Sequence, residues 1–314
     1  MELLLVLAGI IVLFIGGESL IKGTVSIAIN LKISKILVSS VIVGFGTSMP
    51  EMTISLQAMF QGSPEIAIGN IIGSNIANIL LIIGLCALIS PFSFKNLSSR
   101  RDIYAMLISI AVYFIFDLTG KVTFFNGLLM ILGLCCYIIY SYFHDKKNFK
   151  DEDIKNIEQD LGMSQPYNIW KSFAMAIIGI LLLVAGSSLF LKGATSLAQR
   201  FHISEEVIGL FVVALGSCLP ELATSIIAAL RKHTSVIVSA IVGSNIFNIL
   251  SIGGAISLVE DVNIPSHIAM IDVPFLLITT CIFAFLLIKG VNFSRLYGLL
   301  FTATYVVYTY LLFI

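Results

Sequence analysis

The chain has 314 residues, of which 58% are hydrophobic and only 11% are charged, and its formal net charge at pH 7 is zero. A soluble globular protein carries about 25% charged residues, so this chain holds more apolar surface than folding in water can bury. The composition excludes an ordinary soluble enzyme and a basic nucleic-acid-binding domain, and it predicts an integral membrane protein.

Ten apolar segments have about the length that a helix needs to cross a bilayer. They are 2–21, 36–60, 65–90, 103–117, 122–143, 169–191, 205–230, 234–258, 267–288 and 293–313. The first has neither the basic flank nor the small-residue cleavage site of a signal peptide, so we expect a retained span. The sequence therefore predicts an all-α, polytopic membrane protein.

Lysine and arginine are distributed unevenly over the predicted loops. Only Lys121, Lys192 and Arg200 fall on one side, whereas the other 15 of the 18 basic residues fall on the opposite side. Because basic loops stay in the cytoplasm, the richer side is predicted to be cytoplasmic. Both termini are then expected outside the plasma (inner) membrane.

Two stretches of sequence recur at a constant separation. "GFGTSMPEMT" from Gly44 is similar to "ALGSCLPELA" from Ala214, and "NIIGSNIANIL" from Asn70 to "AIVGSNIFNIL" from Ala240, each 170 residues apart. The chain is thus predicted to be a duplication of five spans. Since five is odd, the second copy enters the membrane from the opposite side, as in many secondary transporters. The predicted organisation is a first repeat 1–143, a polar cytoplasmic linker 144–168 and a second repeat 169–314.

Glu51 and Glu221 are repeat mates near the middle of their predicted spans. A charged side chain at the bilayer centre costs about 2.5–3.5 kcal/mol on insertion scales. Two such residues at equivalent positions indicate function, with a protonated or hydrogen-bonded packing glutamate as the alternative.

A proline precedes each glutamate. Inside a helix, Pro50 and Pro220 would each release the carbonyl four residues back, which belongs to Gly46 and Gly216. Backbone oxygens freed beside a carboxylate are good ligands for a hard cation. The alternative is an ordinary proline kink that only shapes the helix.

Hydroxyl and amide side chains complete the two motifs. Several of them are spaced four residues apart, which places them on one face of a helix. The positions are Thr47, Ser48, Ser74, Asn78, Ser217, Ser244 and Asn248. The alternative is interhelical hydrogen bonding without an ion, which fits Asn75 and Asn245 better.

The motifs offer carboxylate, hydroxyl, amide and backbone oxygens, and no histidine, arginine or thiolate cluster accompanies them. Oxygen ligands with two negative charges suit Na⁺ and Ca²⁺. The five cysteines fall in apolar segments without metal-ligand spacing, so we expect neither a zinc site nor a disulfide framework. No resident cofactor is predicted.

At these residues the chain resembles the cation/Ca²⁺ exchanger superfamily, in particular its prokaryotic Na⁺/Ca²⁺ exchangers. "GTSMPE" and "GSNIAN" in the first repeat, and "GSCLPE" and "GSNIFN" in the second, follow the order of the family's motifs. The resemblance implies ten spans and alternating access by sliding of 2–21 and 169–191. It also implies ion ligands at Glu51, Glu221, Thr47, Ser48, Ser74, Asn78, Ser217, Ser244 and Asn248 and at the backbone of Gly44 and Ala214.

Two positions depart from the usual pattern of the family. Asn248 stands where several members have aspartate, and Cys218 stands where serine is usual. A thiol is a weaker ligand for Na⁺ than a hydroxyl. These departures leave the coupling ion, the stoichiometry and K⁺ dependence open.

The sequence therefore predicts a secondary-active antiporter, not an enzyme, that exchanges Ca²⁺ for Na⁺. We expect it to act as a monomer, with membrane lipid and the transported cations as its partners. Alternatives are Ca²⁺/H⁺ exchange, K⁺-dependent exchange and exchange of another divalent cation. A channel is a further alternative, although it would not need an inverted pair of sites.

Overall fold

The computed structural model describes residues 2–93, 100–148, 167–200 and 216–312, which are almost entirely helical. The first half contains α1 (Glu2–Leu31), α2 (Lys35–Val38), the π-helical η1 (Ser39–Val43), α3 (Gly44–Thr47), α4 (Met49–Phe60), α5 (Pro64–Ala77), η2 (Asn78–Ile82), α6 (Ile83–Ile89), β1 (Phe92–Ser93), α7 (Arg100–Asp117), β2 (Lys121–Val122) and α8 (Phe124–Asn148). The second half contains α10 (Ile169–Arg200), α12 (Leu219–Leu230), α13 (Thr234–Phe247), η3 (Asn248–Gly253), α14 (Gly254–Val259), β3 (Val262–Asn263), η4 (Ile268–Asp272), α15 (Val273–Lys289), β4 (Asn292–Phe293) and α16 (Arg295–Leu311).

In the part of the chain that the structure describes, six helical stretches are long and apolar enough to cross a membrane. They are Glu2–Leu31, Pro64–Ile89, Phe124–Lys147, Ile169–Leu197, Thr234–Val259 and Ile268–Lys289. The remaining predicted spans are also helical where the structure describes them, but α7 carries charges at its ends and α4 is short. The all-α, multi-pass class is therefore confirmed. Helices α1, α8 and α10 extend beyond the predicted spans, and most of the linker, 149–166, lies outside the described residues.

The two halves repeat each other element by element. Helices α4 and α12, α5 and α13, and strands β1 and β3 all begin 170 residues apart. Even unusual backbone conformations recur: Gly62 and Lys232 both have positive φ, 71° and 60°, and so do Gly120 and Gly290, at 75° and 62°. The duplication predicted from the motifs thus extends to the connecting turns.

The halves are also interleaved. Strand β1 pairs with β4, and β2 pairs with β3, so each small antiparallel sheet takes one strand from each half. Gly84 of α6 packs against Gly298 of α16, and Gly254 of α14 packs against Gly127 of α8. Helix α16 of the second half therefore packs on α6 of the first half, and α8 of the first half packs on α14 of the second.

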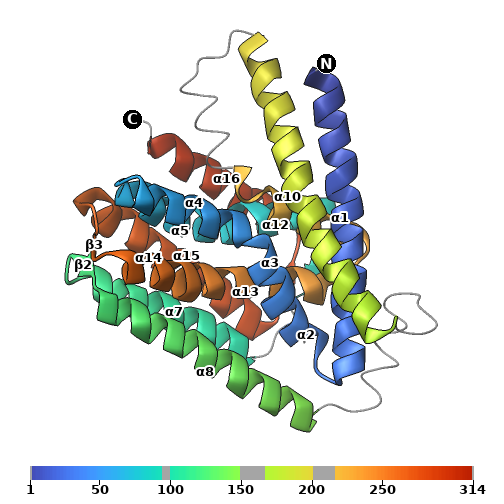
Figure 1. Ribbon diagram of the computed structural model, residues 1–314, viewed down its shortest axis with the longest axis horizontal. Coiled ribbons are helices and arrows are strands. Elements are labelled where there is room, and N and C mark those ends of the chain that lie inside the picture. The colour runs from blue at the N-terminus through green and yellow to red at the C-terminus, as the bar shows by residue number, and fades with distance from the viewer. Residues whose placement is uncertain (1, 94–99, 149–166, 201–215, 313–314) are drawn as a thin grey trace.

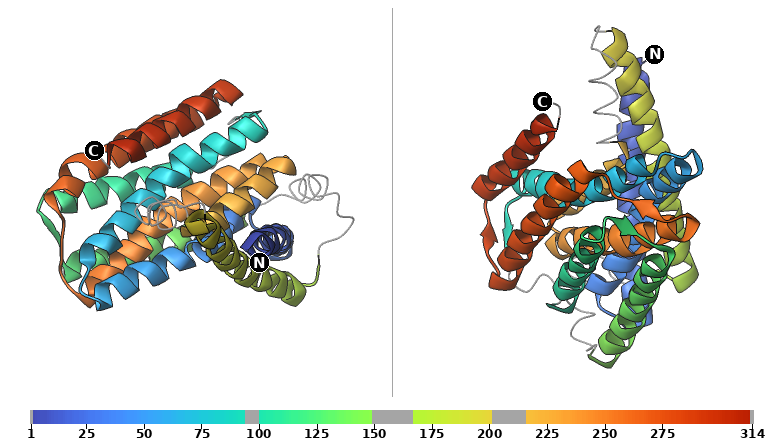
Figure 2. Two further views of the ribbon diagram at one scale, coloured as in Figure 1. Left: turned by 90° about the horizontal axis from the view of Figure 1, so that it is seen from above. Right: turned by 90° about the vertical axis from the view of Figure 1, so that its left-hand side faces the viewer.

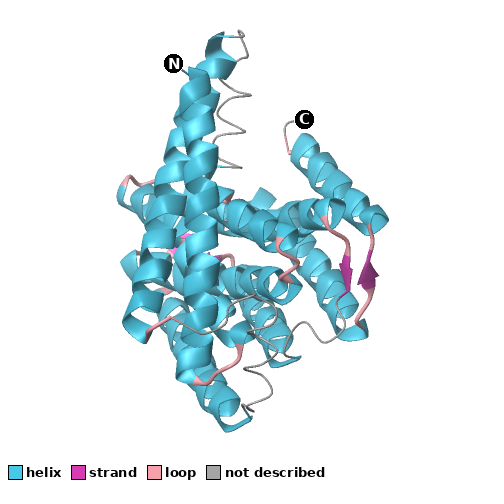
Figure 3. Ribbon diagram, turned by 90° about the vertical axis from the view of Figure 1, so that its right-hand side faces the viewer, coloured by secondary structure: helices cyan, strands magenta, loops and turns pink. Residues whose placement is uncertain are grey.

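Helices α1 and α10 form an antiparallel pair along one flank of the molecule, as Figures 1 and 3 show. Their glycines, spaced seven residues apart, bring the two backbones close together. A β-carbon at Gly9, Gly16 or Gly23 would lie 2.6–2.9 Å from a backbone nitrogen of α10. The same holds in reverse for Gly179, Gly186 and Gly193, at 2.6–2.8 Å from nitrogens of α1.

The core lies around α5 and α13, which run through the middle of the molecule (Figures 1 and 2). Every residue of α13 from Ser235 to Phe247 is buried. By contrast, only about a third of the apolar window of α1 is buried. Helix α13 is thus shielded on all sides and α5 over most of its length, whereas α1 presents much of its surface to the surroundings.

Candidate cation site

The backbone breaks just before each glutamate. Helix α3 ends at Thr47 and α4 begins at Met49, with Ser48 between them at φ −82° and ψ 6°. Cys218, the repeat mate of Ser48, has nearly the same conformation, φ −78° and ψ 0°. Each proline therefore lies in the first turn of a new helix, where its missing N–H costs nothing, and does not kink a continuous helix.

One of the carbonyl groups expected to be free is already engaged. The Gly216 oxygen accepts a hydrogen bond from Ser187 Oγ of α10 at 3.3 Å. One of the two lone pairs of this carbonyl is thus used by a side chain of the α1–α10 pair, and the role of Gly216 as an ion ligand stays a prediction. The bond links α10 to the broken helix in the second half.

Glu51 and Glu221 lie at the centre of the molecule, and only 1% and 3% of their surfaces are exposed. Each carboxylate faces the broken helix of the other half. Ser48 Oγ donates to Glu221 Oε1 at 3.3 Å, and Glu51 faces the side chains of Ser217 and Cys218. The structure thus places predicted hydroxyls beside the glutamates, but each glutamate lies beside the hydroxyl of the other repeat.

Several oxygens of this centre are buried without a hydrogen-bond partner among the described residues. They include Glu51 Oε2, Glu221 Oε2, Asn78 Oδ1 and Asn248 Oδ1, and the Asn75 Oδ1 and Asn248 Nδ2 atoms are unpartnered as well. A buried polar atom without a partner is costly, unless a ligand of opposite character meets it. Four such oxygens, two from each half, fit a cation. Within the described residues no group of three or more His, Cys, Asp or Glu side chains assembles.

The asparagines hold the third spans of the two halves together. Asn78 Nδ2 donates to Asn245 Oδ1 at 3.0 Å, and Asn245 Nδ2 donates to the Asn75 carbonyl at 3.4 Å. The interpretation of Asn75 and Asn245 as packing residues agrees with this geometry. Asn78 takes part through its nitrogen, which leaves its oxygen for another role.

The predicted ligand at Gly44 is a backbone oxygen that has three hydrogen-bond partners. It accepts from Ser244 Oγ at 3.2 Å, from the Ser48 N–H at 3.2 Å and from Thr47 Oγ1 at 3.4 Å. The close approach requires glycines, since a β-carbon at Gly44 would lie 2.8 Å from the Ser244 nitrogen and one at Gly243 would lie 2.2 Å from the Ser40 oxygen. Ala214, the predicted mate of Gly44, lies outside the described residues.

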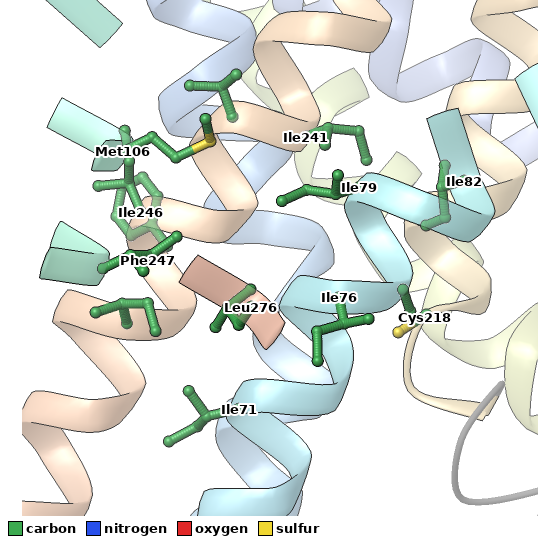
Figure 4. Close-up of a cluster of buried hydrophobic side chains, with 14 of the residues drawn as sticks. Ile71, Ile76, Ile79, Ile82, Met106, Cys218, Ile241, Ile246, Phe247 and Leu276 are labelled. Carbon is green, nitrogen blue, oxygen red and sulfur yellow. The ribbon is translucent and has the colours of Figure 1, made fainter. Parts of the chain in front are cut away.

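Cys218 is buried, with 3% of its surface exposed. Figure 4 shows it at the edge of a cluster of buried apolar side chains that includes Ile76 and Ile82. Its sulfur lies 3.9 Å from Ser217 Oγ. The thiol therefore lies between the polar centre and the apolar core.

A cavity of about 520 Å³ lies beside the centre. Its lining includes the buried Ser74 and Ser217 and the exposed Glu65. Gly73 also lines the cavity and has no atom within 4 Å of the place of a β-carbon. Its mate Gly243 is packed tightly against η1, so one half of the site is open and the other is closed.

Sequence reasoning missed three polar residues here. Asn70 donates to the Glu51 carbonyl at 3.1 Å and to Ser55 Oγ at 3.0 Å, which ties α5 to α4. Asp272 lines the cavity, and Tyr308 beside it donates to Asp272 Oδ1 at 2.8 Å. Asn70 stands within a repeated motif, but its counterpart in the second half is Ala240. Comparing the two halves therefore does not mark Asn70 as a functional residue.

Comparison with known proteins identifies the family. The family described as sodium/calcium exchanger protein matches residues 1–143 and 171–314. An uncharacterized membrane protein of Methanocaldococcus jannaschii, MJ0091, is 32% identical over 96% of this chain and 94% of its own length. The sodium/calcium exchanger MaX1 of Methanosarcina acetivorans is 27% identical over 99% and 98% of the two chains.

A solved structure agrees with these relatives. The sodium–calcium exchanger NCX_Mj, soaked with 10 mM Na⁺ and no Ca²⁺, superposes with a TM-score of 0.81 and is 27% identical. The superposition covers 98% of this chain and 97% of the other. The resemblance seen in the motifs is thereby confirmed, and the chain belongs to the sodium/calcium exchanger family of membrane transporters.

Proposed function

We propose that the protein is an antiporter that exchanges Ca²⁺ for Na⁺, with Glu51 and Glu221 as the charged ligands shared by the two ions. Membership of the sodium/calcium exchanger family supports cation exchange. The observation that carries the proposal is the set of four buried oxygens, from Glu51, Glu221, Asn78 and Asn248, that have no hydrogen-bond partner within the described part of the chain.

These oxygens can serve both ions. Two carboxylates balance the charge of one Ca²⁺ or of two Na⁺, and amide oxygens complete a hard-ligand shell without adding charge. Because both ions need the same carboxylates, they compete, and competition couples their movements. Ser48 and Ser217 supply hydroxyls beside the carboxylates.

The difference between the two halves supports alternating access. Gly73 and Ser74 line an open cavity, whereas their mates Gly243 and Ser244 are sealed against η1 and Gly44. If the halves are inverted repeats with ten spans, exchanging these two arrangements opens the site to the other side. The α1–α10 pair is the element that we expect to slide. The distribution of lysine and arginine favours an extracytoplasmic opening for the present cavity, with both termini on that side of the plasma membrane.

The test is Na⁺-driven Ca²⁺ transport by Glu51→Gln and Glu221→Gln proteins. Replacing either carboxylate removes half of the charge of the site, so we expect uptake of ⁴⁵Ca²⁺ into Na⁺-loaded proteoliposomes to fall to the level of empty liposomes. Glu260→Gln, at an exposed acid that is not among the lining residues of the cavity, is the matched control and should transport normally.

Ion gradients applied one at a time separate the alternatives. Ca²⁺ uptake driven by a proton gradient without Na⁺ would instead indicate Ca²⁺/H⁺ exchange, and uptake that needs K⁺ would indicate a K⁺-dependent exchanger. Normal Na⁺-driven uptake by both glutamine variants would contradict the assignment of the site.

A further inference from the structure

The cavity that leads to the candidate site holds a second acidic position. Asp272 ends η4 and lines the cavity, although only 7% of its surface is exposed. Its Oδ1 accepts the Tyr308 hydroxyl at 2.8 Å, and its other oxygen accepts no hydrogen bond from a described residue. The Tyr308 ring is stacked on Phe275, with centroids 4.5 Å apart and planes 6° apart. The carboxylate is thus fixed in place, with one oxygen available to the cavity.

The charges around this cavity favour a cation. Its lining includes the acids Glu65 and Asp272 and one histidine, His267, and none of its described lining residues is lysine or arginine. A cleft lined by charges of one sign with apolar walls concentrates ions of the opposite sign. A cation entering past Glu65 would meet Asp272 before reaching Ser74 and Ser217.

The first half offers a parallel, because the mate of Asp272 also pairs with a tyrosine, although Tyr308 lies one position beyond Val307, the mate of Tyr137. Asp102, 170 residues before Asp272, accepts the hydroxyl of Tyr137 at 3.0 Å. There the carboxylate also pairs with Arg101 Nε at 2.8 Å and only 2% of its surface is exposed. Arg101 has Ile271 as its counterpart in the second half, so Asp272 has no such cation. The carboxylate of Asp102, which does not line the cavity, is thus neutralised by an arginine, whereas the carboxylate of Asp272, which lines it, has no arginine at the equivalent position.

We propose that Asp272, oriented by Tyr308, is an outer cation-binding station that captures Ca²⁺ on its way to the central site. The proposal rests on cation exchange as the proposed function for its role in transport, but binding at Asp272 can be measured without transport. Asp102 is the equivalent position on the opposite face, held by Arg101 while that face is closed.

Transport kinetics provide the first test. In right-side-out vesicles, we expect Asp272→Asn to raise the external Ca²⁺ concentration for half-maximal uptake about fivefold at low ionic strength, with the maximal rate unchanged. The effect should shrink in high salt, because screening weakens it. Asp272→Glu should restore the wild-type value, and Glu260→Gln, an exposed acid outside the cavity lining, is the matched control. An unchanged half-maximal concentration in Asp272→Asn would overturn the proposal.

A variant that spares Asp272 guards against misfolding of Asp272→Asn. Thr309 lines the same cavity. A lysine there adds a positive charge, so Thr309→Lys should raise the half-maximal Ca²⁺ concentration relative to Thr309→Gln, which sets the reference for side-chain size. Equal values for the two variants would count against electrostatic capture in this cavity.

Tb³⁺ luminescence provides a test that does not depend on transport. Tb³⁺ binds to Ca²⁺ sites and emits when a nearby tyrosine, here Tyr308, is excited. In protein carrying both Glu51→Gln and Glu221→Gln, we expect sensitised emission to persist and to be lost on adding Asp272→Asn. Emission unaffected by Asp272→Asn would overturn the outer station even if exchange is confirmed. If Asp272→Asn abolishes emission but the wild-type protein shows no Na⁺-driven Ca²⁺ uptake, the proposed function is contradicted and the outer cation-binding station is not.

Discussion

At the scale of single residues, the two halves of the centre differ in the residue at the helix break, which is Ser48 in the first half and Cys218 in the second. Ser48 donates a hydroxyl hydrogen bond to Glu221, whereas the equivalent position beside Glu51 is Cys218. A thiol is both a weaker hydrogen-bond donor and a softer ligand than a hydroxyl. Glu51 is therefore held less firmly than Glu221, and any Na⁺ bound beside it has one hard ligand fewer.

Substituting this residue tests the consequence. Cys218→Ser should lower the Na⁺ concentration for half-maximal exchange by about fivefold, the equivalent of one hydrogen bond of about 1 kcal/mol. The measurement is Ca²⁺ efflux from proteoliposomes as a function of external Na⁺. The matched control is Ser48→Cys, which should shift the Na⁺ dependence in the opposite direction. The same Na⁺ dependence in all three proteins would show that this atom takes no part.

Residue patterns predicted which side chains gather at the centre, but not how they pair. The spacing of Thr47 and Glu51 suggested a hydroxyl and a carboxylate on one helix face. The break at Ser48 turns the chain there, and the hydroxyl of Ser48 reaches the glutamate of the other half instead. Such a crossed arrangement depends on how the halves pack together, which spacing along one helix does not contain.

At the scale of elements, the α1–α10 pair is defined by its glycines. Because they lie seven residues apart on both helices, the two backbones touch along their length. Ser172 Oγ also donates to Ser26 Oγ at 2.9 Å near one end. Close packing of this kind, rather than hydrophobic burial, stabilises helix pairs in membranes. It makes the pair a single stiff unit.

A larger residue at this contact should separate the helices. Gly179→Val would place a side chain where a β-carbon already meets the Leu20 nitrogen at 2.6 Å. Overpacking costs about 1–3 kcal/mol or more, so we expect a lower thermal unfolding midpoint and loss of exchange. Size-exclusion chromatography of heated detergent samples measures the midpoint. Gly133→Val, in α8 with no atom within 4 Å, is the control, and an equal effect there would refute the packing explanation.

The prolines show why element boundaries were harder to predict than the elements themselves. A proline in an apolar segment is compatible with a kinked helix or with the start of a new one. The nearly identical conformations at Ser48 and Cys218 show that a new helix begins beside each proline. The engagement of Gly216 by Ser187 was also beyond sequence, since it depends on a helix that comes from another part of the chain.

At the scale of the whole molecule, the duplication was readable because its motifs were conserved between the halves at one offset. Ten apolar segments and a repeated motif were sufficient to predict the all-α membrane class. The strand pairing between the halves could not be predicted from the sequence, because β1 (Phe92–Ser93), β2, β3 and β4 are two-residue strands in short loops without a sequence signature. The pairing of β1 with β4 and of β2 with β3 emerges only when both halves are folded together.

Interleaving predicts that neither half is stable alone. We expect separate fragments 1–155 and 156–314 to aggregate when each is expressed by itself, because strand edges and glycine-lined helix faces lack partners. Co-expressed, they should purify together through a tag on one fragment and recover Ca²⁺ transport. The intact chain is the reference, and a monodisperse, thermally stable 1–155 fragment would refute the expectation.

The strand pairings also set an order for biosynthesis. The first five helices leave the ribosome and enter the bilayer while β4 and β3 have not yet been made. Strand β2 has no partner until β3 is made, and β1 has none until β4 is made just before the last helix, so we infer that membrane insertion and final folding are separate in time. A nascent chain that stops before Asn292 would be inserted in the membrane without the partner strand of β1. This incompletely folded chain is the species that quality-control proteases of the membrane would encounter.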